Sequence, residues 1–165
     1  MILAKAQEFR ALSLTILLVL FPLFSSCNDT TPQFYKFEQV NFKVPSGKNI
    51  KVYIAKSTQE QAIGLSGTKP EQFSDSDAML FPAKEMSDRQ FWMPETYMDL
   101  DLFFMNEDYY ILDIHRNLKH FTKRQPEHLV PRSKTVYSQH VLEMKSSSPF
   151  SKELQIGMKL EMKKD

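Results

Sequence analysis

The clearest pattern along the chain is an alternation of apolar and polar positions on both sides of a short turn segment. Val40, Phe42 and Val44 alternate with polar residues, and the same period of two returns over residues 50–54. The intervening residues 45–49 include Pro, Ser, Gly and Asn, which favour turns. This arrangement predicts a β-hairpin.

A short helix is expected directly after the hairpin. Ser57 or Thr58 stands three positions before Glu60 or Gln61, which is the spacing of a capping box. An apolar face follows and stops at Gly67, a residue type that commonly ends helices.

From residue 78 onward the pattern is that of short strands separated by turns. The runs that we interpret as strands cover residues 78–81, 89–93, 101–105, 109–115, 135–144 and 158–162. Residues 106–108 (Asn-Glu-Asp) predict a tight turn, and Ser148-Pro149 predicts a helical turn over residues 149–154. Many short strands with two short helices predict a mainly β fold, either a compact β-sandwich or a partly open barrel.

The N-terminal segment has a different pattern. Lys5 and Arg10 precede an apolar run over residues 11–24, and small residues follow it. This is the order of a signal peptide. A membrane-spanning helix is the weaker interpretation, because such a helix needs about 20 apolar residues and this run is shorter and contains Pro22. We therefore expect residues 1–26 to be a signal peptide.

The sequence Ser25-Ser26-Cys27 resembles the lipobox of bacterial lipoproteins. This resemblance implies that Cys27 carries lipid, so that the membrane is a partner through this anchor; an ordinary signal peptide is the alternative. Residues 27–36 would then form the tether and residues 37–165 a single domain. By the same analogy, Asn28 favours the outer membrane or the periplasmic face of the bacterial cell envelope.

Composition excludes several classes of function. The chain of 165 residues has a formal net charge of +1, which provides no large basic surface for nucleic acid. Its single Cys allows no intramolecular disulfide. His115, His120, His128 and His140 lack zinc-hydrolase spacing, and no nucleotide-binding or serine-hydrolase motif is present, so we expect no cofactor.

An ordered set of short motifs resembles the small bacterial and archaeal family called domain of unknown function 192, over about residues 51–162. These motifs are Gly64-Leu65, residues 78–81 (AMLF), residues 91–93 (FWM) with Thr96, Leu100-Asp101, and residues 141–143 (VLE). The resemblance implies a compact jelly-roll-like β-sandwich that is often exported and has no agreed activity. The chain departs from the family at Pro94-Glu95, where Lys-Asn is usual.

Residues 91–101 hold the only Trp of the chain beside several polar side chains, and we expect a shallow ligand-binding cleft there. The candidate ligand-binding residues are Trp92, Met93, Glu95, Thr96, Asp101 and Glu143. Two structural alternatives stay open. Asp101 could accept hydrogen bonds from backbone N–H groups or from Thr96, and Trp92 could simply fill the core.

Other groupings suggest weaker hypotheses. Asp99 and Asp101, with Glu95 or Asp113, could bind Ca²⁺, although the calcium-loop motif is missing. Five methionines suggest Cu(I) binding or core packing: Met79, Met86, Met93, Met98 and Met105. A basic loop could contact lipid head groups or anionic glycan, or could be a solvated face: Lys119, Lys123, Arg124, Arg132 and Lys134. We predict no metal site.

These observations favour a non-enzymatic, lipid-anchored module that binds an unknown envelope ligand or protein. The alternative is an envelope glycan hydrolase or lyase in which Asp101 and Glu95, or Asp101 and Glu143, form an acid/base pair. A third interpretation is a structural interaction protein without a small-molecule site.

Overall fold

The computed structural model describes residues 31–122 and 126–163, which lie within one compact unit. The expected signal peptide, Cys27, the first part of the tether, Lys123 and Arg124 lie outside the described residues. The elements in chain order are η1 (Gln33–Lys36), β1 (Glu38–Lys43), β2 (Asn49–Ile54), α1 (Thr58–Ile63), η2 (Pro70–Gln72), β3 (Asp77–Phe81), β4 (Ser87–Arg89), β5 (Leu100–Met105), β6 (Ile111–Leu118), η3 (Glu127–Leu129), β7 (Val136–Ser138), β8 (His140–Lys145), α2 (Pro149–Glu153) and β9 (Glu161–Lys163).

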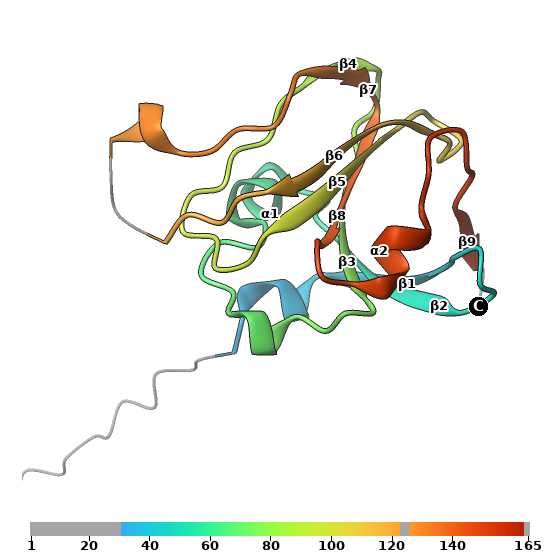
Figure 1. Ribbon diagram of the computed structural model, residues 1–165, viewed down its shortest axis with the longest axis horizontal. Coiled ribbons are helices and arrows are strands. Elements are labelled where there is room, and N and C mark those ends of the chain that lie inside the picture. The colour runs from blue at the N-terminus through green and yellow to red at the C-terminus, as the bar shows by residue number, and fades with distance from the viewer. Residues whose placement is uncertain (1–30, 123–125, 164–165) are drawn as a thin grey trace, which may run out of the picture. The chain divides into compact units, whose positions relative to one another are not determined.

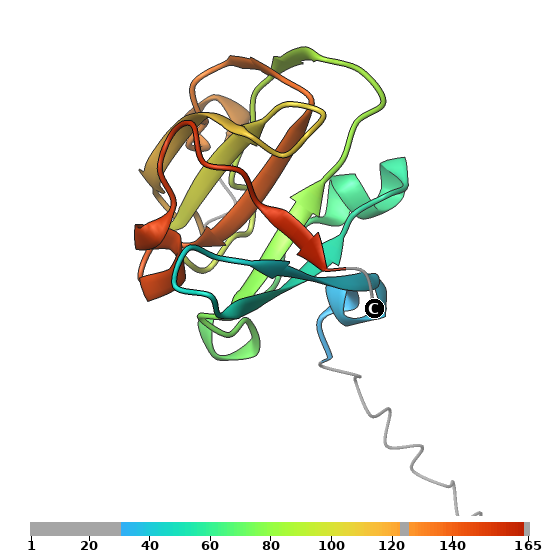
Figure 2. The ribbon, with the colours of Figure 1, turned by 90° about the vertical axis from the view of Figure 1, so that its right-hand side faces the viewer.

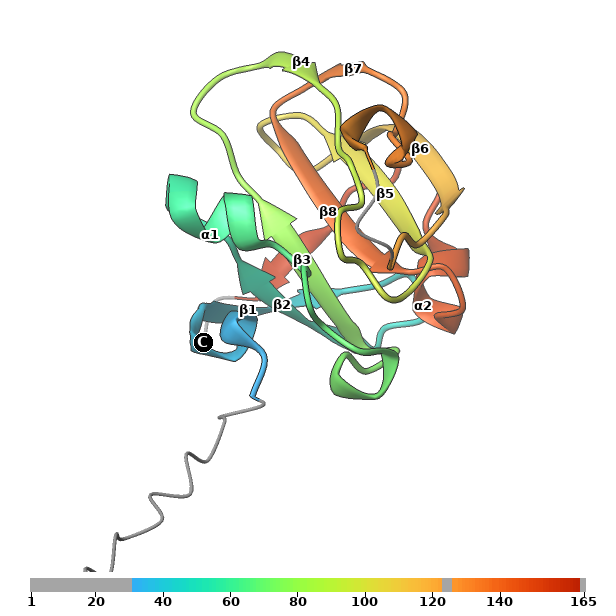
Figure 3. The same cartoon turned by 90° about the vertical axis from the view of Figure 1, so that its left-hand side faces the viewer.

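The main sheet has seven strands in the order β6-β5-β8-β3-β2-β1-β9, and β4 pairs separately with β7 (Figure 1). Figure 2 shows β9 beside β1 at one edge of the main sheet. The β4–β7 ribbon lies beyond the ends of β5 and β8, away from β1 and β2 (Figures 1 and 3). The sheet is not closed into a barrel, so the expectation of a mainly β, sandwich-like fold with two short α-helices is confirmed.

The predicted hairpin and helix are both present. Strands β1 and β2 are antiparallel, with Phe42 opposite Ile50. Ser57 Oγ accepts the N–H of Glu60 at 3.1 Å and the Glu60 carboxylate accepts the N–H of Ser57 at 2.7 Å, which completes the expected capping box. The helix ends at Gly64 and not at Gly67. It connects β2 to β3, the one parallel pair of neighbours in the described sheet.

Both faces of the central strands are buried, so β3 and β5 are apolar except for Asp77 and Asp101 and show no clear alternation. The first core lies on the face that carries Met79 and Phe81, and it is covered by Phe34 and Phe73. The second core lies on the opposite face and includes Leu80, Phe103, Leu142, Leu154 and Leu160. Each face of the sheet therefore has its own apolar layer.

Several strand predictions are wrong in part: β6 covers residues 111–118 and not 109–115, and β9 covers residues 161–163 and not 158–162. Within residues 89–93, Arg89 belongs to β4 and Trp92 forms an isolated antiparallel bridge with Arg132. The pairing does not extend into a strand, because the N–H of Phe91 binds Ser133 Oγ at 2.9 Å. The run over residues 135–144 is divided at Gln139 into β7 and β8. The Ser148-Pro149 helical turn is confirmed as α2. Among the described residues, no helix has the length and apolar character needed to span a membrane.

Candidate functional site

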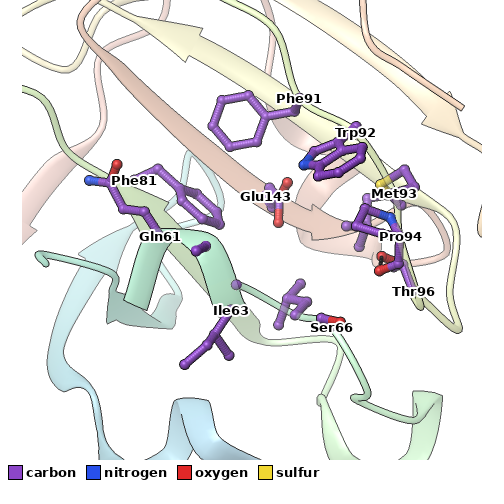
Figure 4. A pocket seen from close by; sticks show the side chains of 14 residues that line it. Gln61, Ile63, Ser66, Phe81, Phe91, Trp92, Met93, Pro94, Thr96 and Glu143 are labelled. Atoms are coloured by element: carbon purple, nitrogen blue, oxygen red, sulfur yellow. Dashed lines mark hydrogen bonds between the residues drawn. The ribbon is translucent and has the colours of Figure 1, made fainter. Parts of the chain in front are cut away.

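A small pocket of about 60 Å³ opens where the end of α1, strand β8 and the loop before β5 meet (Figure 4). Its lining residues are Gln61, Ala62, Ile63, Gly64, Leu65, Ser66, Phe81, Phe91, Trp92, Met93, Pro94, Thr96, Leu100 and Glu143. Ligand pockets for drug-sized molecules are several times larger, on the order of 300–1,000 Å³. The pocket therefore suits one small chemical group better than a whole sugar ring.

Glu143 forms the polar floor of this pocket. The alternation along β8 places Leu142 in the second core and turns Glu143 toward the first, opposite Met79 on β3 and Leu102 on β5. Figure 4 shows its carboxylate between Phe81 on one side and Trp92 on the other. Glu143 is only 4% exposed.

No hydrogen bond or ion pair joins the Glu143 carboxylate to another described residue. No described side-chain N or O atom is both shut off from solvent and without a partner, so the carboxylate oxygens reach the open space of the pocket. Burial raises the pKa of Glu143 from 4.5 to about 8, because no nearby charge or donor favours the ionised form. Buried polar groups are normally hydrogen-bonded, so a carboxylate left open to a pocket marks a candidate binding site.

The end of α1 forms one wall of the pocket and depends on Gly64. The backbone angle φ of Gly64 is +47°, a value that residues other than glycine rarely adopt. A Cβ atom at this position would also stand 3.3 Å from Cζ of Phe81. Glycine thus allows the chain to turn closely past the Phe81 ring.

The loop before β5 forms the other wall and is held by backbone hydrogen bonds. The N–H of Met93 donates to the carbonyl of Pro131 at 3.1 Å, and the N–H of Gly67 donates to the carbonyl of Glu95 at 2.9 Å. Trp92 is 46% exposed, with the guanidinium of Arg132 5.2 Å from its ring centroid. Trp92 therefore lies at the mouth of the pocket and does not fill the core.

The structure brings four of the six candidate residues together. Trp92, Met93, Thr96 and Glu143 line the same pocket. Glu95 is exposed and does not line it. Asp101 does not line it either.

Asp101 is fully buried on the opposite face of the sheet, beside α2. Its carboxylate accepts hydrogen bonds from Ser151 Oγ at 2.5 Å, from the N–H of Asn117 at 2.8 Å and from Arg116 at 2.7 Å. Ser146 Oγ donates at 2.8 Å. Burial raises the pKa of Asp101, but these donors outweigh that effect and hold the pKa below its usual value.

Asp101 therefore has the backbone partner expected by the structural alternative, although Thr96 is not its partner. The Thr96 hydroxyl donates to the carbonyl of Pro94 instead, at 3.3 Å. Arg116 also donates to the carbonyl of Leu154 at 2.5 Å, so the ion pair connects β5 and β6 to α2. This arrangement is structural, and it separates Asp101 from Glu143 by the thickness of the sheet.

Asp99 lines a second, more open depression, together with Asn117 and His120. Its carboxylate accepts hydrogen bonds from Lys119 Nζ at 2.8 Å and from the N–H and ring of His120 at 2.9 and 2.6 Å. Burial raises the pKa of Asp99, but these donors reverse the effect and lower it to about 2. Asp113 pairs separately with Lys134 at 2.5 Å. The carboxylates considered for calcium thus have different partners.

The methionines considered for copper are also dispersed. Met79, Met93 and Met98 pack in the first core, whereas Met105 packs in the second. Within the described residues, no group of three or more His, Cys, Asp or Glu side chains could hold a metal ion.

Comparison with known proteins gives the family. The model of the DUF192 family, described as uncharacterized ACR, matches residues 41–162. This chain belongs to the DUF192 family. The resemblance drawn from its motifs is therefore confirmed, and no curated protein matches the chain.

Two solved structures are similar to this DUF192 protein. One is a Sinorhizobium meliloti 1021 protein described as a candidate transcription regulator, with 25% identity, a TM-score of 0.59, and coverage of 76% of this chain and 92% of that one. The other is a Novosphingobium aromaticivorans DSM 12444 protein of unknown function, with 23% identity, a TM-score of 0.58, and coverage of 74% and 83%. The second likeness shows the fold alone.

The DUF192 motifs converge on the Glu143 pocket, although they are far apart in the sequence. Gly64, Leu65, Phe81, Phe91 and Leu100 line it together with the four candidate residues named above. Sequence reasoning did not select these five residues as site residues. All five belong to the family motifs, and this shared membership could have indicated that they lie in one site.

Proposed function

We propose that this DUF192 protein is a non-enzymatic binding module that receives one small group of a ligand or partner in the Glu143 pocket. The observation that supports it best is the carboxylate at the pocket floor, which is 4% exposed and has no partner among the described residues. A ligand group that contacts this carboxylate would supply the partner that the described chain does not.

The composition of the pocket supports binding over glycan hydrolysis. The hydrolase alternative requires two carboxyl groups on either side of the scissile bond. Glu143 is the only acidic residue among the described residues that line the pocket, and Asp101 lies on the other face of the sheet. A volume of about 60 Å³ also leaves little room for a sugar ring beside a catalytic water.

We further propose that the module works at the bacterial cell envelope, with lipid on Cys27 as its membrane anchor. The support is the charged, apolar and small-residue order of residues 5–27. One or more acyl chains, each contributing about 0.8 kcal/mol per buried CH₂, would hold the domain near a membrane.

The description of the Sinorhizobium meliloti protein as a candidate regulator is not extended to this chain. A formal net charge of +1 offers little attraction for DNA phosphates. Several described basic residues are also paired with carboxylates, including Lys119 with Asp99 and Lys134 with Asp113.

The test is a fluorescence titration of the full chain, kept in mild detergent, with envelope glycan fragments, short peptides and small amines. Trp92 is the only tryptophan and lies at the pocket mouth, so binding there should give a saturable change. Ser66→Phe, which fills the pocket, should abolish the change, whereas the same substitution at exposed Ser87 should not.

Absence of any saturable response to these compounds would overturn the proposal. Glycan cleavage that stops in the Glu143→Gln variant would instead support the hydrolase alternative.

A further inference from the structure

We infer that the group which the Glu143 pocket takes is a small alkylammonium cation, the head group of a larger amine whose remaining part stays outside. This inference rests on the proposed binding function and adds the chemical class of the ligand. It follows from the carboxylate floor, the aromatic walls and the small volume of the pocket.

The floor selects for positive charge. Glu143 lies between Met79 and Leu102, both fully buried, so the surroundings of its carboxylate on the sheet are apolar. The attraction between opposite charges is strongest in such a low-dielectric environment. When Glu143 is ionised, an anionic ligand would meet like charge there and a neutral ligand would leave the carboxylate uncompensated, so only a cation favours the ionised form.

No charged group of the described chain takes the place of the ligand. The polar side chains that line the pocket beside Glu143 are uncharged: Gln61, Ser66 and Thr96. The Gln61 amide donates to the carbonyl of Pro82 at 2.9 Å and the Thr96 hydroxyl to that of Pro94, so these donors point to the backbone.

The walls suit a cation because aromatic faces attract positive charge within about 6 Å of the ring centroid. Phe81 and Phe91 meet edge to face with centroids 5.0 Å apart and planes at 76°. Trp92 completes this aromatic border around the carboxylate (Figure 4).

The chain itself already places cations on two of these rings. The guanidinium of Arg89 lies 5.5 Å from the Phe91 centroid, and that of Arg132 lies 5.2 Å from the Trp92 centroid. Neither arginine is among the causes that shift the pKa of Glu143, so neither neutralises its carboxylate. The acceptor for a cation inside the pocket is therefore still available.

Binding of a cation should be coupled to release of a proton. Because the pKa of Glu143 is about 8, most of the ligand-free protein holds a neutral carboxylic acid at pH 7. A cation favours the ionised form, so its affinity should rise by up to about tenfold per pH unit below pH 8 and level off above it. A neutral hydrogen-bond acceptor would show the opposite trend.

The test compares matched ligands with the full chain in mild detergent, by calorimetry and Trp92 fluorescence at pH 6, 7 and 8. Choline and n-propylammonium are the cations, and 3,3-dimethyl-1-butanol and n-butanol are their uncharged counterparts of similar shape. We expect at least one cation to bind about tenfold or more tightly than its counterpart, with affinity rising with pH and about one proton released above buffer controls.

Glu143→Gln should weaken cation binding about tenfold or more and remove its pH dependence. The same substitution at exposed Glu85 should change neither. The inference would be overturned if the uncharged alcohols bound more tightly than the cations, or if cation affinity changed neither with pH nor in the Glu143→Gln variant. Either result would leave a binding function in place. Failure of these ligands and of the whole earlier panel to bind would overturn the proposed function as well.

Discussion

Replacing Glu143 by Gln should stabilise the protein, although it changes a buried residue at the pocket floor. The Gln amide has the shape of the protonated carboxyl group but cannot ionise. In the native protein burial raises the pKa of Glu143 from 4.5 to about 8. Unfolding therefore releases a proton between these pH values, and the free energy of unfolding of the wild-type protein falls as pH rises through this window.

The size of this effect follows from the pKa difference. One pKa unit corresponds to about 1.4 kcal/mol, so a shift from 4.5 to about 8 amounts to roughly 5 kcal/mol when both states are ionised. Linkage then gives a stability advantage for the variant of about 1 kcal/mol at pH 5, about 2 at pH 6 and about 3 at pH 7. Since small domains have roughly 5–15 kcal/mol of stability, this gain is large.

The assay is urea unfolding of the full chain at constant detergent concentration, followed by Trp92 fluorescence and circular dichroism at pH 5, 6, 7 and 8. Glu85→Gln, which changes an exposed glutamate, is the matched control and should follow the wild-type protein throughout. If the difference in unfolding free energy between Glu143→Gln and wild type stayed constant from pH 5 to pH 8, the proposed burial of an unpartnered carboxylate would be refuted.

Three further predictions concern the surrounding structure. Asp101→Asn should destabilise the protein by about 1.5–3 kcal/mol in urea unfolding, because it removes the charged acceptor of Ser151, Asn117 and Arg116; a loss below about 1 kcal/mol would contradict this role. Asp99→Asn should cost roughly 1–2 kcal/mol at pH 7. Because the pKa of Asp99 is lowered from 3.8 to about 2, that difference should disappear as pH falls through this range, and a difference that persisted at pH 2 would argue against it. Gly64→Ala should destabilise by roughly 1–3 kcal/mol, because it strains a φ of +47° and crowds Phe81, and it should weaken choline binding; unchanged stability and binding would show that the wall tolerates a Cβ.

Local chemistry accounts for the parts of the fold that could be predicted. The β1–β2 hairpin follows from period-two alternation around a turn, and the start of α1 follows from the Ser57–Glu60 capping box. These features depend on residues only a few positions apart. The interruption of pairing within residues 89–93 depends instead on a distant residue. Ser133 Oγ, about forty positions further along the chain, accepts the N–H of Phe91.

The contrast between Asp101 and Glu143 shows what depends on long-range packing. Each is an acidic residue in a strand of apolar residues, and the sequence assigned both to one cleft. The antiparallel register of β5 and β8 sends them to opposite faces, so Asp101 meets Ser151 and Arg116 while Glu143 meets no donor among the described residues. The alternation within each strand could be inferred from the sequence, but the register between β5 and β8 could not.

From the residues alone, the chain's mainly β character, its hairpin, its helix starts and its family could be established, because each depends on short-range patterns or ordered motifs. The site required the folded chain. The first core, which includes Phe34, Phe73 and Met93, covers a sheet face on which a glutamate in β8 would otherwise be exposed to solvent. Burial of Glu143 arises from contacts between segments distant in sequence, and these contacts convert an ordinary strand residue into a carboxylate with a pKa of about 8.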